Sequence, residues 1–101
     1  YLNSLPQIRE KTRLIIMDAI FVEYKWQNGR KQDYVERMGR ILISDDPVAM
    51  DSIGWKMIEE KRKEHGLPHV SPQPVFIQKA ADSGLGVNDP EHIVFKEINL
   101  N

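Results

Sequence analysis

The chain has 101 residues, of which 41% are hydrophobic and 29% charged, the composition of one globular domain or of a piece of one. Its formal net charge is -1, so the chain as a whole has no electrostatic attraction for nucleic acid or anionic lipid. It contains no cysteine, which excludes disulfides, a thiolate zinc site, a cysteine nucleophile and an iron–sulfur cluster ligated by this chain. No apolar run approaches the roughly 20 residues of a membrane-spanning helix.

The first residues indicate that the chain is a fragment. The sequence begins YLNSLPQIRE, without an initiator Met or a charged leader, so we expect residues 1–101 to be a single domain fragment of a longer protein. Residues 2–11 are typical of a short helix. The apolar run from Leu14 to Met17 then predicts a strand buried on both faces, as in parallel sheets, and this strand ends at Asp18.

A polar excursion occupies residues 23–40. It carries the pair Asn28-Gly29, a strong tight-turn signal that either closes a hairpin or tips a long loop. Its basic and aromatic residues are those of an RNA-binding surface, but acidic residues lie between them. Together with the net charge of the chain, this argues against nucleic acid as a partner.

The segment RILIS, residues 40–44, predicts a second strand, and a helix follows it. Asp46 and Pro47 mark the start of this helix, because an aspartate side chain caps the first amides and proline is tolerated at the first helical position. Apolar residues then recur at helical spacing as far as Ile58, and Gly66 ends the polar run after them.

The remaining residues predict a short helix and a closing strand. VFIQKAADSGLG, residues 75–86, is typical of a helix that Gly84 ends, and HIVFKEI, residues 92–98, predicts the strand. We therefore expect an α/β fold with a small mixed or parallel sheet and helices packed on it, as part of a larger α/β protein. The expected order is strand, excursion, strand, helix, helix, strand.

Three aspartates are the candidate functional residues. Asp18 ends the first strand, Asp46 follows the second, and Asp51 lies one helical turn further and leans back toward the helix start. If the two strands are parallel, these carboxylates converge in a crevice, where they suit Mg²⁺ or Mn²⁺ or supply a general base. The alternative is that they are caps and solvated turns, and an antiparallel hairpin would separate Asp18 from the others.

The sequence SDDPVAMDSIGWKMI, followed by IQKAADSGLGVND, resembles the family called domain of unknown function 362. Members of that family carry a strand, a DPVAxD helix start and a later AAxxGLG segment before a final strand. The IIMDAI strand, which contains Asp18, is similar to the family's IVDA strand. Two segments depart from this pattern: residues 23–40 are richer in charge and aromatics, and the helix from Asp46 is longer.

The resemblance implies that the chain is the C-terminal part of a longer α/β protein, with the missing N-terminal part as its first partner. Relatives are often fused to, or encoded as, ferredoxin-like iron–sulfur proteins. The resemblance thus also implies a redox association, a ferredoxin-like partner and a cluster elsewhere in the full-length protein. Some relatives carry twin-arginine export signals, which leaves a cytoplasmic and an exported location open. The family's recurring acids correspond to Asp18, Asp46 and Asp51.

Two functions are compatible with these patterns. The first is an acidic crevice in a redox-associated protein that binds a divalent cation or a polar ligand. Asp18, Asp46 and Asp51 would be its metal ligands, and Asp18 and Asp51 its catalytic candidates. The alternative is a structural or docking module in which the acids are caps and the aromatic residues of the excursion pack on the missing N-terminal part: Tyr24, Trp26 and Tyr34.

Overall fold

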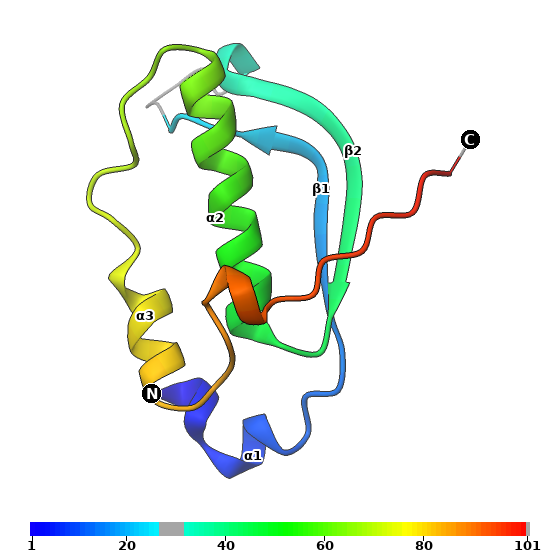
Figure 1. The fold of residues 1–101 in the computed structure, drawn as a ribbon, viewed down its shortest axis with the longest axis vertical. Coiled ribbons are helices and arrows are strands. Elements are labelled where there is room, and N and C mark those ends of the chain that lie inside the picture. The colour runs from blue at the N-terminus through cyan, green and yellow to red at the C-terminus, as the bar shows by residue number, and fades with distance from the viewer. Residues whose placement is uncertain (27–31, 101) are drawn as a thin grey trace.

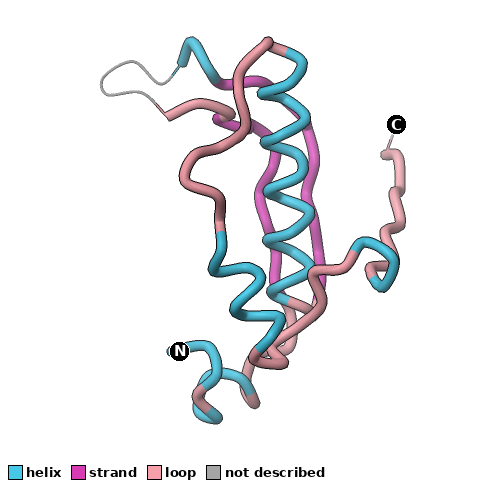
Figure 2. The backbone as a smooth tube through the Cα atoms, turned by 60° about the vertical axis from the view of Figure 1, so that its left-hand side comes forward, coloured by secondary structure: helices cyan, strands magenta, loops and turns pink. Residues whose placement is uncertain are grey.

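The computed structural model describes residues 1–26 and 32–100. Its three longest elements are the strands β1 (Ile15–Glu23) and β2 (Val35–Ser44) and the helix α2 (Pro47–Glu64). The shorter elements are the helices α1 (Pro6–Arg9) and α3 (Val75–Asp82) and the 3₁₀ turns η1 (Leu2–Ser4), η2 (Gln32–Tyr34) and η3 (Pro90–His92). The helix α2 runs along one face of the two strands, and α3 lies beside the N-terminal half of α2 (Figures 1 and 2).

The strands β1 and β2 form a two-stranded antiparallel sheet, with Ile16 opposite Ile43 and Asp18 opposite Ile41. The expected α/β class, with helices packed on a small sheet, is confirmed. The strands are antiparallel rather than parallel or mixed, because the excursion reverses the chain without the crossover that parallel strands need. The predicted Asn28-Gly29 turn lies outside the described residues.

The core lies between α2 and the inner face of the sheet. Strand β1 contributes Ala19 to it, and α2 contributes Met50 and Met57, which lie two turns apart on one face of the helix. Val48 lies on the other side of α2, near Gly86. The helix α3 adds one buried side chain. The buried hydrophobic residues are Ala19, Tyr24, Val48, Met50, Met57 and Ile77.

Two of the three aromatic residues expected to pack on a missing part of the protein pack within this chain. Tyr24 is buried, stacks on the ring of His65 with centroids 4.4 Å apart, and meets the ring of Tyr34 edge-on at 6.0 Å. Trp26, in contrast, is 69% exposed. The docking expectation is therefore wrong for Tyr24, because the end of α2 already covers its ring.

The outer face of the sheet, opposite α2, is apolar and uncovered. Ile16, Ile41 and Ile43 point away from the helix because strand residues alternate between the two faces, and they are 64%, 61% and 64% exposed. The cross-strand pair Ile16 and Ile43 places two of these side chains next to each other. Within the described part of the chain, this outer face, defined by Ile16, Ile41 and Ile43, lacks the second layer that an apolar sheet face normally has.

The expected closing strand is not formed. Pro90–His92 make the turn η3, and residues 93–100 are irregular and extend away from the helices beside β2 (Figure 1). Val94 and Ile98 are 84% and 81% exposed, and one ion pair, Arg40 Nη2 to Glu97 Oε1 at 3.6 Å, joins this segment to β2. An apolar β-prone sequence becomes a strand only when a ladder pairs its backbone, and here no ladder does.

None of the described helices combines the length and the apolar character that a membrane span requires.

Candidate ligand-binding groove beside strand β1

Asp46 is the N-cap of α2, as the sequence predicts. Its Oδ1 accepts hydrogen bonds from the backbone amides of Val48 and Ala49, each at 2.9 Å. Its Oδ2 accepts a third from the amide of Val87, also at 2.9 Å, in the loop after α3. Backbone amides therefore use both carboxylate oxygens, so Asp46 satisfies the start of α2 and holds a distant loop at the same time.

Gly86 allows this loop to approach so closely. A Cβ at position 86 would lie 2.7 Å from Asp46 Cγ and 2.9 Å from Val48 Cβ, closer than packed side chains approach. Arg9 ties the same loop to α1, because its Nη2 donates to the carbonyl oxygen of Gly84 at 2.7 Å. The segments DPVAMD and AADSGLG, far apart in the sequence, are thus two halves of one junction.

Asp18 lies within β1 rather than at its end, and it is exposed. Its Oδ1 accepts a hydrogen bond from the amide of Ile20 at 2.9 Å. Ile20 has no partner in the register with β2, which shifts between Ala19 and Phe21. Such a bulge leaves a residue outside the ladder, and the Asp18 side chain supplies the acceptor for its amide.

Asp18 and Asp51 line the same groove, although they come from different elements. The groove has a volume of about 450 Å³ and runs between β1, α2 and α3. Most of its lining is apolar and includes Met17, Phe21 and Phe76. Asp51 is exposed, yet partial burial by these surroundings raises the pKa of its carboxyl above the ordinary 3.8.

Glu23 is a third acid on this groove. Its Oε1 is buried, and among the described residues it has no hydrogen-bond partner. Among residues 1–26 and 32–100, no lysine, arginine or histidine lines the groove. Asp18, Glu23 and Asp51 are therefore the charged residues in the described lining of the groove beside β1, and all three are acidic.

The three predicted aspartates do not come together as one metal site. Within residues 1–26 and 32–100, no three His, Asp or Glu side chains lie close enough together to hold a metal ion. The carboxylate of Asp46 is used by amides, whereas Asp18 and Asp51 share the groove. An iron–sulfur cluster does not fit these residues either, because the chain offers no cysteine.

A family model described as Domain of unknown function (DUF362) matches residues 2–56, which is more than half of the chain. The chain belongs to this family. The matched residues of the DUF362 domain include β1, β2 and the start of α2, and with them Asp18, Asp46 and Asp51. No curated protein and no solved structure matches the chain.

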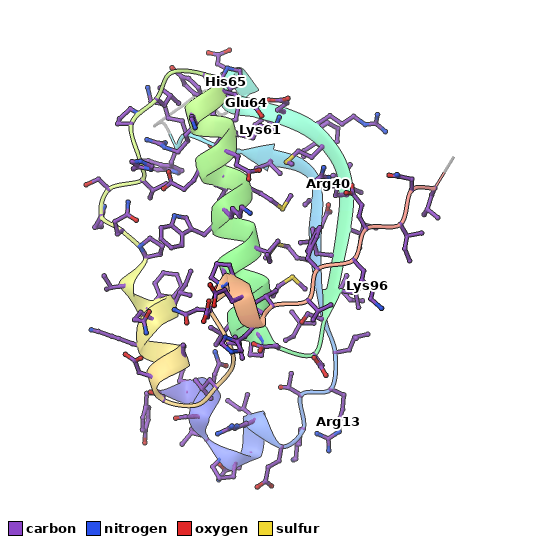
Figure 3. The ribbon with its side chains drawn as sticks, viewed as in Figure 1. Arg13, Arg40, Lys61, Glu64, His65 and Lys96 are labelled. Carbon is purple, nitrogen blue, oxygen red and sulfur yellow. The ribbon has the colours of Figure 1, made fainter. Side chains whose placement is uncertain are left out.

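One charged cluster, mostly beyond the residues that match DUF362, is not predicted by the sequence pattern. Lys61, Glu64 and His65 lie together at the end of α2 (Figure 3). Lys61 Nζ lies 3.0 Å from Glu36 Oε1 and 2.8 Å from Glu64 Oε2, and His65 Nε2 lies 3.3 Å from Glu36 Oε2. Hydrogen bonds from Lys61 and His65 lower the pKa of Glu36 below its ordinary 4.5. The spacing of Lys61 and Glu64, three residues apart on a helix, predicts their ion pair. No pattern in the sequence predicts the ion pair of Lys61 with Glu36 on β2.

A second unpredicted group is centred on Glu59. Its Oε1 accepts from Trp55 Nε1 at 3.0 Å and from the amide of Val70 at 2.9 Å, and its Oε2 lies 2.7 Å from His69 Nδ1. Burial raises the pKa of Glu59, but these three hydrogen bonds together outweigh it and the net shift is downward. Glu59 thus fixes the connection between α2 and α3.

Proposed function

We propose that this chain is a docking module of a larger α/β protein, in which another part of that protein covers the outer face of the sheet. The observation that carries the proposal is the exposure of Ile16, Ile41 and Ile43, each more than 60%. Soluble proteins rarely expose a contiguous apolar patch such as three neighbouring isoleucines on one sheet face. Burying these side chains would stabilise the protein by roughly 25 cal/mol per Å² of apolar area.

The size of the sheet supports the same proposal. The described residues form two strands, with a helix on one face only. A sheet of two strands is only marginally stable by itself. Stable α/β sheets have more strands and are covered by helices on both faces. A module of this kind gains its full stability when the remaining layer is supplied by the larger protein.

Replacing two of the isoleucines tests this function. Ile41→Thr/Ile43→Thr keeps β-branched side chains, and hence strand preference, while removing apolar surface. We expect little change in the unfolding free energy of the 101-residue chain and a clear loss in the larger protein that contains it. Val75→Thr, at a position on α3 that is 61% exposed, is the matched control. Equal effects of the double variant in both proteins would refute docking through this face.

A second candidate function is binding of a cationic ligand, or proton transfer, by the carboxylates of the groove beside β1. It is favoured by Asp18 and Asp51 lining one groove and by the raised pKa of Asp51. A carboxylate in an apolar setting is a better proton acceptor than one in water. Asp51→Asn separates this function from docking, because it would abolish ligand binding or turnover without loss of stability.

The family resemblance also implies that the larger protein is associated with redox chemistry through a ferredoxin-like partner, and this association stays a proposal. Because this chain has no cysteine, a cluster would have to be bound elsewhere in the larger protein. The visible absorption spectrum and iron content of that protein, purified without oxygen, test it. Iron with charge-transfer bands supports the association, and a colourless, iron-free protein contradicts it.

A further inference from the structure

Strand β1 is paired on one edge only. Its single partner among the described residues is β2, so the backbone amides and carbonyls of its other edge have no ladder. An open strand edge is a template on which another extended segment can pair. The side chain of Asp18 accepts a hydrogen bond from one backbone amide of β1, that of Ile20 at the bulge.

The groove beside β1 supplies space for the side chains of such a segment. It has a volume of about 450 Å³ and is lined by β1 itself together with α2 and α3. Side chains of a strand alternate, so every second one of an added strand would point under the helices. Met17, Phe76 and Ile77 offer apolar contacts there. The groove and the open edge therefore suit one extended, partly apolar segment.

The charges of the groove select among such segments. Asp18, Glu23 and Asp51 line it, and no basic side chain in the described part of the chain does. The buried Oε1 of Glu23 has no hydrogen-bond partner among the described residues. A lysine or arginine entering the groove would supply donors to these carboxylates, whereas an acidic side chain would be repelled.

We propose that β1 accepts an extended strand with alternating apolar and basic side chains, whose basic side chains enter the groove, so that their aliphatic stems contact its apolar lining and their charged ends pair with Asp51 and Glu23. This inference rests on the proposed docking function and names the chemistry of one partner segment. It uses the edge of β1 rather than the outer face defined by Ile16, Ile41 and Ile43. The two surfaces can therefore succeed or fail separately.

Two short peptides test the proposal with the 101-residue chain. One alternates valine and lysine, and the other alternates valine and glutamate, so they match in length and strand preference and differ in charge. Hydrogen exchange of the β1 amides reports pairing. We expect the lysine peptide to slow exchange along β1, the glutamate peptide to have no effect, and added salt to weaken the binding.

The Asp51→Asn variant tests the ion pair. It should weaken binding of the lysine peptide about three- to fivefold, the size expected for one partly exposed ion pair. Asp45→Asn, at an exposed carboxylate outside the groove, is the control and should leave binding unchanged. Equal binding of both peptides, or exchange at β1 that neither peptide slows, would overturn the inference. The Ile41→Thr/Ile43→Thr result would decide docking through the outer face independently.

Discussion

The bond between Asp46 and Val87 can be separated from the capping of α2 by one substitution. Asp46→Asn keeps an acceptor oxygen for the amides of Val48 and Ala49, and asparagine caps helices as well as aspartate does. Its amide group, however, would face the N–H of Val87 with another donor. The loop after α3 would then lose its attachment while the helix start keeps its cap. Asp46→Ala, in contrast, removes both.

The geometry sets the size of each effect. Loss of an aspartate cap costs about 1 kcal/mol. A hydrogen bond to a charged group contributes about 1.5 to 3 kcal/mol, and the exposure of the bond to Val87 places it at the lower end. We therefore expect a loss of about 1.5 kcal/mol for Asp46→Asn and about 2.5 kcal/mol for Asp46→Ala. Both are large fractions of the roughly 5 to 15 kcal/mol that stabilises an ordinary domain.

Urea unfolding followed by far-ultraviolet circular dichroism measures both variants, with Asp45→Ala as the control at the neighbouring exposed carboxylate. Helix content at low urea should be unchanged in Asp46→Asn, because α2 remains capped. If Asp46→Asn is as stable as the wild type, the bond to Val87 contributes nothing and the junction is held in another way. If Asp45→Ala is equally destabilised, the effect is one of net charge.

Three further predictions concern the junction, the groove and the charged cluster. Gly86→Ala should destabilise the fold by about 1 to 3 kcal/mol in the same urea assay, because the added methyl group overpacks against Asp46 and Val48; unchanged stability would contradict the close approach. Gly54→Ala should be neutral or slightly stabilising, since its Cβ would meet the flexible end of Met17 at 3.0 Å and alanine favours helix by about 1 kcal/mol. The lowered pKa of Glu36 means that its ionised form stabilises the fold above about pH 4.5 and that this contribution is lost as the pH falls through the lowered value. Stability measured against pH should therefore fall less steeply on the acid side in Glu36→Gln, and an unchanged slope would contradict the pairing with Lys61.

Local signals in the sequence predict the helices well. Asp46 and Pro47 mark the start of α2 because capping is decided by neighbouring residues, and Gly84, with a φ of 73°, ends α3 for the same reason. The apolar run before Asp18 predicts a strand, but strand orientation depends on how the chain reverses between β1 and β2. Periodicity alone carries no information about that reversal.

The sequence predicts that Asp18 and Asp51 lie close together only if the two strands are parallel. Asp18 and Asp51 do line one groove, but the antiparallel strand brings Asp18 there from the middle of β1. The predicted closing strand does not form, because a strand needs a neighbouring strand to pair with, and the sequence of residues 92–98 does not show whether one is present. Contacts such as Glu36 to Lys61, 25 residues apart, depend on the finished fold and leave no local pattern.

The bond between Asp46 and Val87 closes a ring of chain that contains all of α2, the proline-containing connection and α3. A cut in the exposed connection near Pro68 would open that ring without releasing either piece, since the junction and the Glu59 contacts still hold them together. The domain therefore offers a position for complementation from two fragments. New chain ends at this point would also leave β1, its groove and the outer face of the sheet intact.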